Sequence, residues 1–340
     1  MMGYDFKESL GSFFQSYLDY LIHFSKFLAQ PSHRFFILFI ISSLAIAFFL
    51  YHRRKESGGF LSFLFPASVW SNPAAWLDVR YFFFHGLIGH FLLFGFGVTS
   101  YFAGLFIGMG FVGDDSLAPV SPFSPTASFL IAGAFLIIIT FVNSFITFYL
   151  HYLQHKIPLL WQFHKVHHSG EVMHPLSNYR EHPVDNLTYK LFGGLGTGLA
   201  SGVMLRFIGY TPTSFDILGL SIFMLGFNVG AYHLRHSHIW LKWPGIWSKV
   251  FASPAHHHVH HSRHPDHLDK NFAFLFPFWD VLFGCYHMPE DNRDVEFGIV
   301  EDATELNSCV NLYLIPFRDA YRLLNTPKTA ASEKIIEAEI

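Results

Sequence analysis

Histidines are the residues of this chain with the most chemistry to offer, because they are grouped at spacings that suit an α-helix. His151 and His155 form an HxxxH pair, and two HxxHH groups follow at 164–168 and 257–261. On a helix, positions i, i+3 and i+4 share one face, so we expect the imidazoles of each group to point to one place. Neutral imidazole is the commonest metal ligand. Eight histidines exceed what one ion needs, so the pattern predicts two metal ions.

An exposed, histidine-rich patch that collects metal adventitiously is the alternative, since 17 of the 23 histidines lie between residues 151 and 267. The repeated spacing beside the ends of apolar segments favours a specific site instead. Zinc sites use four protein ligands, or three and a water, and haem uses one or two histidines. Imidazole also suits iron, copper and nickel. The ligand number indicates a non-haem di-metal centre, and we favour iron because a redox centre beside lipid could activate O2 against C–H bonds.

The composition indicates an integral membrane protein. Hydrophobic residues make up 51% of the chain, with 42 phenylalanines and only 14% charged residues, which is too little charge for a soluble surface. The net charge of −3 gives no support for a nucleic-acid partner. The two cysteines, Cys285 and Cys309, form neither a CxxC pair nor a disulfide framework.

Several apolar stretches predict membrane helices, at 35–51, 82–112, 127–150, 187–208 and 214–232. The basic run 52–55 follows the first stretch, which places that end in the cytoplasm, whereas the loop 113–126 lacks Lys and Arg. Every histidine cluster then lies on the cytoplasmic side. We expect an all-α integral membrane protein with four to five transmembrane or re-entrant helices and a cytosolic helical cap that holds the histidine-rich di-metal site.

Three regions are predicted along the chain. Residues 1–34 form an N-terminal interfacial amphipathic segment, although a helix packed on the protein's own body fits the same pattern. Residues 35–315 form the membrane and catalytic domain, with histidine boxes at 151–168, 233–238 and 257–261. Residues 316–340 form a polar C-terminal tail.

The glycine-rich run 193–198 lacks the strand–turn–helix context of a phosphate-binding loop. Its Gly194xxxGly198 spacing predicts close helix packing in the membrane instead, as do Gly104xxxGly108 and Gly226xxxGly230.

The order of the histidine motifs resembles the fatty acid hydroxylase/sterol desaturase superfamily of membrane di-iron enzymes, and in particular its bacterial sterol-desaturase-like members. The motifs are HxxxH, then HxxHH before a serine, then HxxHH between Ser-Pro and a serine. YREHP at 179–183, LRHSHIWL at 234–241, DKNF at 269–272 and WDVLFG at 279–284 add to a resemblance that covers about 145–290. It implies a helical membrane fold with a cytosolic cap holding two irons, and O2-dependent hydroxylation or desaturation of a lipid.

The resemblance also implies the iron ligands His151, His155, His164, His167, His168, His257, His260 and His261. His236 occupies the matching His-Ser position between the boxes, and His233, one turn earlier, shares its face; His238 is a weaker candidate. The sequence contains no nucleotide or flavin fingerprint, so we expect a separate electron donor of the ferredoxin or cytochrome type with its reductase. The expected location is the bacterial inner membrane, multi-pass, with the active site on the cytoplasmic side.

Two other classes of function remain open. A membrane metal-binding or metal-transport protein would use the histidines as a reservoir, and a di-zinc membrane hydrolase would use them without O2. The sequence also leaves the substrate open among sterols, fatty acyl chains, ornithine lipids and ether lipids. Arg180, in the YREHP segment, is expected to hold a headgroup, to support the metal site, or to form a structural salt bridge.

Overall fold

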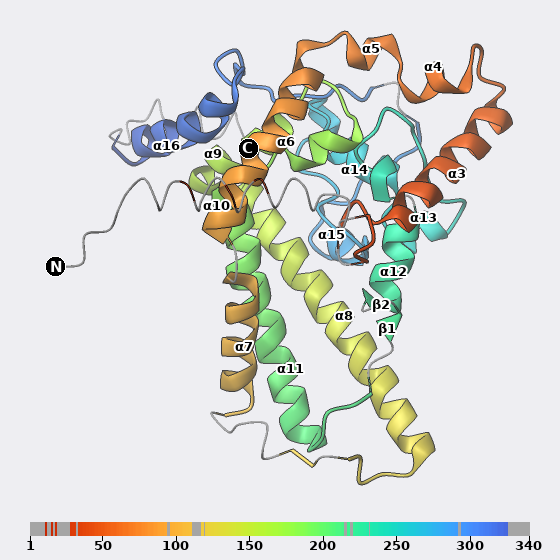
Figure 1. The fold of residues 1–340 in the computed structure, drawn as a ribbon, viewed down its shortest axis with the longest axis vertical. Helices are drawn as coiled ribbons and strands as arrows, with labels where there is room; N and C mark the ends of the chain where they lie inside the picture. Colours follow the sequence, from red (N-terminus) through yellow and green to blue (C-terminus); the bar gives the residue numbers. More distant parts are fainter. Residues whose placement is uncertain are drawn as a thin grey trace. The chain divides into compact units, whose positions relative to one another are not determined.

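The structure, drawn in Figure 1, is a computed structural model. The chain divides into two compact units. It describes residues 11, 15, 18, 28–31, 33–93, 96–110, 117–118, 120–213, 216–217, 220–230, 232–291 and 294–325. One unit combines residues 1–56 with 216–233, and the other combines 57–215 with 234–340. Most of the predicted amphipathic segment 1–34 lies outside the described residues, and so does the end of the predicted tail, 326–340.

Among its described residues the smaller unit contains the long apolar helix α3 (Ile37–Arg54), whose last turn carries His52, Arg53 and Arg54. Its second part is a short antiparallel hairpin of β1 (Asp216–Ile217) and β2 (Leu220–Ser221), followed by α12 (Ile222–Val229). The hydroxyl of Ser221 accepts a hydrogen bond from the Met224 amide and begins α12. The stretch predicted at 214–232 therefore contains a hairpin and a helix of only eight residues, about 12 Å long.

The larger unit is built on long helices. α6 (Pro73–Leu93) and α7 (Phe96–Gly108) divide the stretch predicted at 82–112 between them. α8 (Pro125–Lys156) has 32 residues, about 48 Å at a rise of about 1.5 Å per residue. α10 (Pro183–Thr188) continues through a π-helical segment, η3 (Tyr189–Gly193), into α11 (Gly194–Ile208).

α7 and α11 run side by side (Figure 1), and glycines allow their backbones to approach. A Cβ added at Gly104 or Gly108 would collide with the carbonyl oxygens of Leu195 and Leu199. A Cβ at Gly198 would collide with the carbonyl oxygen of Tyr101, and Gly202 is confined in the same way. Close packing at the glycines of 104–108 and at Gly198 is thus confirmed. A Cβ at Gly226 would meet nothing, so the prediction for that glycine was wrong.

Within the part of the chain that the structure describes, three helical segments are long and apolar enough to cross a membrane: Ile37–Arg54, Pro125–Lys156 and Pro183–Ile208. The sequence predicted four to five transmembrane or re-entrant helices, and within the described residues neither 82–112 nor 214–232 supplies a further helix of this class. Large apolar side chains on α7, α8 and α11 are exposed, among them Phe102, Phe129, Leu130, Ile137 and Phe207. An apolar surface of this extent suits a lipid environment.

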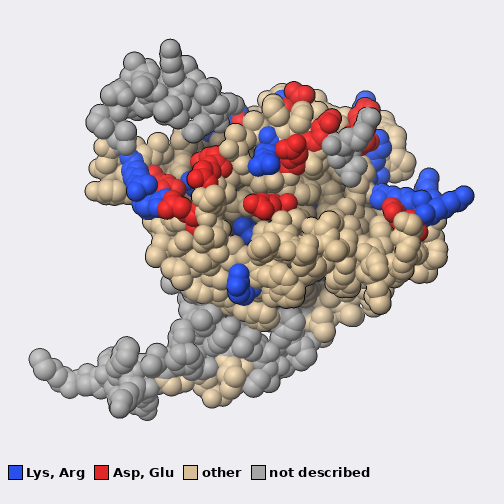
Figure 2. Space-filling view, turned by 90° about the horizontal axis from the view of Figure 1, so that it is seen from above, with Lys and Arg blue, Asp and Glu red and all other residues tan. Residues whose placement is uncertain are grey.

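The larger unit also contains further, mostly short elements. They are α4 (Phe60–Leu64), α5 (Ala67–Trp70), α9 (Pro158–His168), η2 (Pro175–Tyr179), η4 (Tyr232–Leu234, whose first two residues are assigned to the smaller unit), α13 (Trp247–Val250), α14 (Pro254–His260), η5 (Pro265–His267), α15 (Phe278–Leu282) and α16 (Cys309–Asn325). α16 runs across residue 316, where the polar tail was predicted to begin. Figure 2 shows acidic and basic side chains interspersed on the face that is seen from above.

Two buried clusters hold the elements that carry the histidines. One packs Val166 of α9 against Leu77 and Tyr81 of α6 and against Leu312 and Ile315 of α16. The other packs Phe148 of α8 against the segment 272–285, through side chains that include Phe272, Trp279 and Cys285. Burial of each such side chain contributes roughly 1.5–3 kcal/mol, so one cluster holds α9 and the other holds α8.

Candidate metal centre

Pro158 causes the turn between α8 and α9. Pro158 begins α9 at its first helical position, and Ile157 before it is extended, with φ −102° and ψ 111°. A residue before proline disfavours helical angles, so the chain leaves α8 and restarts as a second helix. The turn brings His151 and His155 of α8 opposite His164 and His168 of α9.

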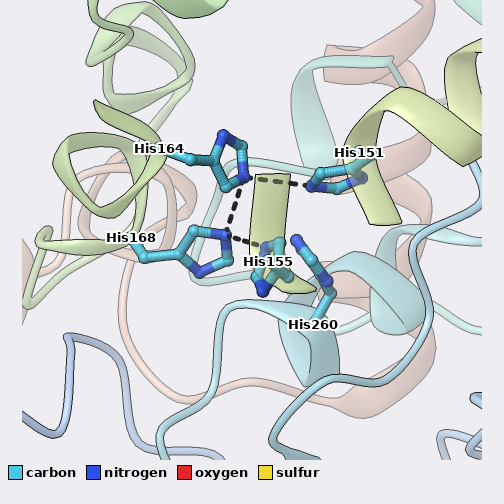
Figure 3. A group of neighbouring side chains, drawn as sticks. All are labelled: His151, His155, His164, His168 and His260. Carbon is cyan, nitrogen blue, oxygen red and sulfur yellow. Dashed lines mark hydrogen bonds between the residues drawn. The ribbon is translucent and has the colours of Figure 1, made fainter. Parts of the chain in front are cut away.

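Five imidazoles form the first cluster, which we name group A: His151, His155, His164, His168 and His260. One ring nitrogen from each lies within 4.8 Å of all the others. The rings point toward one another (Figure 3), with Nε2 of His151 at 3.1 Å from Nε2 of His164. Nε2 of His168 lies 3.1 Å from that of His155 and 3.3 Å from that of His164. α14 supplies His260 from a distant part of the chain.

Four imidazoles form the second cluster, which we name group B: His167, His236, His257 and His261. Nε2 of His257 lies 2.8 Å from Nε2 of His236 and 3.1 Å from Nε2 of His261. The two groups are neighbours, because the rings of His168 in group A and His261 in group B stack with centroids 4.3 Å apart.

Each HxxHH motif divides between the two groups, which differs from the expectation that its three imidazoles share one target. In the first motif His164 and His168 belong to group A, whereas His167 belongs to group B. In the second, His257 and His261 belong to group B, and His260 belongs to group A. The i and i+4 residues thus stay together while the i+3 residue serves the other group. Residues i+3 and i+4 lie on either side of the same helical face, so two adjacent targets can each take one of them.

Hydrogen bonds at Nδ1 determine which ring nitrogen carries the proton and which one can bind a metal. In group A, Nδ1–H of His151 donates to the carbonyl of Phe272 at 2.9 Å, and that of His260 to the carbonyl of Lys270 at 2.9 Å. Nδ1 of His164 lies 3.2 Å from a carboxylate oxygen of Asp185. These acceptors require a proton on Nδ1, which leaves Nε2 with a bare lone pair. A carboxylate or carbonyl behind the ring is the usual partner of a metal-bound histidine.

The bare lone pairs fit a metal ion. Nε2 of His151 and Nε2 of His164 face each other at 3.1 Å while both Nδ1 protons are committed elsewhere, so neither nitrogen has a proton to donate. Nε2 of His260 is buried with no hydrogen-bond partner. Two nitrogens each about 2.1 Å from one ion would lie about 3.0–3.4 Å apart at right-angle or tetrahedral geometry. The observed spacing is therefore that of ligands around a shared cation.

Burial also keeps these rings neutral, which is the form that binds a metal. It lowers the pKa of His168, His260 and His261 well below the usual value, and neighbouring imidazoles lower these pKa values further. Among the described residues both groups consist of histidine alone. A site of this kind suits iron, copper, nickel or zinc by ligand type.

Group B has a different set of supporting contacts. Nδ1 of His167 donates to the carbonyl of Arg180 at 3.2 Å. Ser177 Oγ donates to the His174 carbonyl at 2.8 Å, so it accepts from Nδ1 of His236 at 3.0 Å. Both contacts come from the loop that follows α9, residues 169–182.

Two of the candidate histidines lie elsewhere. His233 belongs to neither group; its ring stacks on Phe35 with centroids 6.0 Å apart within the smaller unit. His238 donates from Nε2 to the carbonyl of Phe63 at 2.7 Å. The assignment of the other nine histidines as metal ligands stays a prediction that their grouping supports.

Sequence reasoning missed the side chains behind the ligands. Asp185 supports His164, and Asp269, whose carboxylate lies 3.3 Å from Nδ1 of His155, supports the second ligand of α8. Asp280 accepts hydrogen bonds from the amides of Phe272 and Ala273 although it is almost completely buried. Its position as the lone acid in an aromatic run was a usable signal, because a buried carboxylate needs partners.

A family model of fatty acid hydroxylases matches residues 136–285. All nine grouped histidines fall within this range. The match begins inside α8 and ends just after α15, so it covers the elements that build both groups.

Curated relatives cover the same part of the chain. Alkylglycerol monooxygenase of Danio rerio is 29% identical over 157 residues, which are 45% of this chain and 30% of that protein. The Homo sapiens alkylglycerol monooxygenase is 26% identical over 45% of the chain and 30% of its own length. Ornithine lipid hydroxylase OlsE of Rhizobium tropici is 27% identical over 44% of the chain and 40% of its own length. The chain thus spans well under half of each relative, and no solved structure matches it.

Proposed function

Because the chain belongs through residues 136–285 to the fatty acid hydroxylase superfamily, we propose that it is a membrane-bound, O2-dependent oxygenase acting on a lipid at two iron ions. One observation carries the proposal: nine imidazoles from α8, α9, α14 and the segment at 236 converge in two adjacent groups. In this proposal His151, His155, His164, His168 and His260 hold one iron, and His167, His236, His257 and His261 hold the other.

Iron bound in this way supplies activation of O2 toward a C–H bond of the substrate. The protein itself binds the metal ions and orients the histidine ligands. The acceptors behind His151, His164 and His260 keep each proton on Nδ1 and each Nε2 directed inward, so the ligands need no rearrangement when metal binds.

The chain also separates the site from water. Phe274 lies beside both groups, with its ring centroid 5.8 Å from that of His151 and 6.5 Å from that of His257. Phe272 packs on His151, His155 and His260 at 4.9–5.5 Å. We propose that Phe274 forms an apolar wall that positions a lipid carbon and excludes water from the reacting centre.

Hydroxylation is the reaction we favour over desaturation, since the relatives are named as a monooxygenase and a hydroxylase. The same names make an ether lipid and an ornithine lipid the first substrates to test. The reaction needs electrons from outside, for which we propose a separate carrier protein with its reductase.

We further propose that the protein is a multi-pass protein of a bacterial inner membrane, with the site in a helical cap on the cytoplasmic side. The basic end of α3 and the absence of Lys and Arg from the loop 113–126 support this orientation. With that loop outside, α8 carries His151 and His155 to the cytoplasmic side.

The test is lipid mass spectrometry on membranes that contain the full chain, an electron donor and ¹⁸O2. We expect about two irons per chain and a product lipid that carries one ¹⁸O. Replacing His164, His168 and His260 together with Ala should abolish the product, whereas His238→Ala, outside both groups, should retain it. Loss of two hydrogens without ¹⁸O would show desaturation instead. Turnover by a zinc form without O2, or exchangeable metal with no O2 consumption, would overturn the proposal in favour of a hydrolase or a metal-transport protein.

A further inference from the structure

We propose that the two histidine groups are held by separate supporting networks, each anchored by one buried aspartate, so that either ion can be lost without the other. Asp280 is the positioning residue for group A, and Asp78 is the positioning residue for group B. The inference rests on the proposed di-metal function and assigns roles to residues that bind no metal themselves.

A four-residue strap, Asp269–Phe272, supports three of the five ligands of group A. The carboxylate of Asp269 lies 3.3 Å from Nδ1 of His155. The carbonyl of Lys270 accepts from His260, and the carbonyl of Phe272 accepts from His151, both at 2.9 Å. Each of these contacts fixes a ring and its tautomer, so displacement of the strap would misplace ligands from both α8 and α14.

The strap has two residues in the left-handed conformation, and side-chain contacts hold it in place. Asp269 and Asn271 adopt φ values of 56° and 57°, in the left-handed region, which Asp and Asn tolerate better than other non-glycine residues do. The Asn271 side chain donates to the His287 carbonyl and accepts from the His287 amide, both at 2.8 Å. Asp280 accepts from the Phe272 amide at 2.7 Å and from the Ala273 amide at 3.2 Å.

Asp280 is therefore the fixed point of the strap. Its side chain is nearly inaccessible, with 1% of the residue exposed, and each carboxylate oxygen is used by a different backbone amide. An asparagine in its place could accept only one of the two bonds, and its amide group would face the second N–H as another donor. A buried donor without a partner is destabilising, because it loses its hydrogen bond to water and gains none in the protein.

The loop after α9 supports group B in the same manner. Ser177 Oγ holds Nδ1 of His236 at 3.0 Å, and the carbonyl of Arg180 holds Nδ1 of His167 at 3.2 Å. These two ligands come from different parts of the chain, and this loop is the element that fixes both rings.

Asp78, in α6, anchors that loop. One of its carboxylate oxygens accepts from Nε of Arg180, and the other lies 3.2 Å from Nε2 of His174. Asp78, Arg180 and His174 are each at most 2% exposed. Arg180 also donates to Ser169 Oγ at 3.1 Å and to the Ala74 carbonyl at 3.3 Å. Loss of the carboxylate charge would leave the guanidinium buried without its counter-ion, which is strongly destabilising for its surroundings.

The two networks share no hydrogen-bond partner among the contacts of Asp78 and Asp280 in the described residues. The strap is fixed against α8 by the cluster around Phe148, whereas the loop is fixed to α6. The ligand helices α9 and α14 contribute to both groups. The strap and the loop are thus independent of each other, although α9 and α14 carry ligands of both groups. We therefore expect a substitution that displaces the strap to spare the ion of group B, and one that displaces the loop to spare the ion of group A.

The test is the metal content of purified full-length Asp280→Asn and Asp78→Asn. We expect about two ions per wild-type chain and about one in each variant, with affinity for the lost ion reduced roughly 10- to 100-fold. The cobalt forms identify the ion that remains: Asp78→Asn should show a single ion with up to five imidazoles, and Asp280→Asn a single ion with four. X-ray absorption and the visible d–d spectrum distinguish these cases, and neither readout depends on activity.

The retained ion in each variant also reports that the rest of the protein has folded. If an Asn variant fails to accumulate, Asp269→Asn and Ser177→Ala weaken the same networks more mildly and should show the same division. Variants that keep both ions at unchanged affinity, or that each lose both ions, would overturn the inference. A wild-type chain that binds no metal would instead overturn the proposed function, so the two failures are distinguishable.

Discussion

Nη2 of Arg235 lies 3.1 Å from Nδ1 of His257, and this hydrogen bond can run in only one direction. A guanidinium has no acceptor, so His257 accepts at Nδ1 and carries its proton on Nε2, the nitrogen that faces His236 and His261. A metal ion at Nε2 would require this proton to leave. The same guanidinium is buried over the ring of Phe274, 4.6 Å from its centroid. Arg235 therefore opposes a cation in group B, both through the tautomer of His257 and through its own charge.

Replacing Arg235 with Met should tighten metal binding in group B, because the substitution removes the charge and frees Nδ1 of His257 to carry the proton. We expect an increase in affinity of about tenfold, the size typical of a change behind a ligand, measured by competition with a chelator. Arg263→Met is the matched control, since Arg263 forms a half-exposed ion pair with Glu296. Weaker binding in Arg235→Met would show that the arginine supports the site.

Phe274→Ala should separate oxygen use from product formation. The variant removes the ring that lies beside both groups and leaves every histidine in place. We expect unchanged metal content and continued O2 consumption, with a yield of hydroxylated lipid per electron about tenfold lower, because small misplacements of a substrate have large effects on rate. Phe278→Ala, at a half-exposed phenylalanine of α15, is the control. An unchanged yield would exclude the role proposed for Phe274.

Gly198→Ala should destabilise the protein, because its Cβ would collide with the carbonyl oxygen of Tyr101 and force α7 away from α11. Overpacking of this kind costs about 1–3 kcal/mol. Gly193→Ala is a matched control in the same helical segment, where an added Cβ meets nothing within 4 Å, and alanine there should be neutral or mildly stabilising. Thermal unfolding in detergent measures both variants. Equal melting temperatures would contradict the close approach of the two helices.

His182 should make stability depend on pH. It is buried, it donates from Nε2 to the Tyr313 carbonyl, and its Nδ1 accepts from the Val184 amide at the start of α10. Burial lowers its pKa from 6.5 to about 4, so the unfolded chain binds more protons between these values. The free energy of unfolding should therefore fall as the pH drops from about 6.5 toward 4, by on the order of 3 kcal/mol for this group.

The variant His182→Asn isolates this contribution. Asparagine retains an acceptor for the Val184 amide but does not titrate, so the variant should be less stable at pH 8 and less sensitive to acid than the wild type. Denaturant unfolding at several pH values gives the two slopes. Parallel slopes would mean that the His182 side chain takes up its proton without opposition in the folded state.

Short-range sequence signals determined much of what was found. The composition and the apolar runs predicted a helical protein with membrane-spanning helices, and the spacing of the histidines predicted which side chains would gather. The order of the boxes indicated the superfamily. The apolar runs and the spacing within each histidine box depend on residues at most a few turns apart, where helix geometry relates spacing to direction.

Only the tertiary structure decided how the histidines divide and what holds them. The HxxHH motif does not predict that His167 joins group B while His164 and His168 join group A. That division depends on the position of α14 relative to α9. The acceptors behind His151 and His155 come more than a hundred residues later in the chain, and the hairpin at 216–221 interrupts a run that reads as a membrane helix. Contacts between residues so far apart are set by packing, which a pattern along one chain does not record.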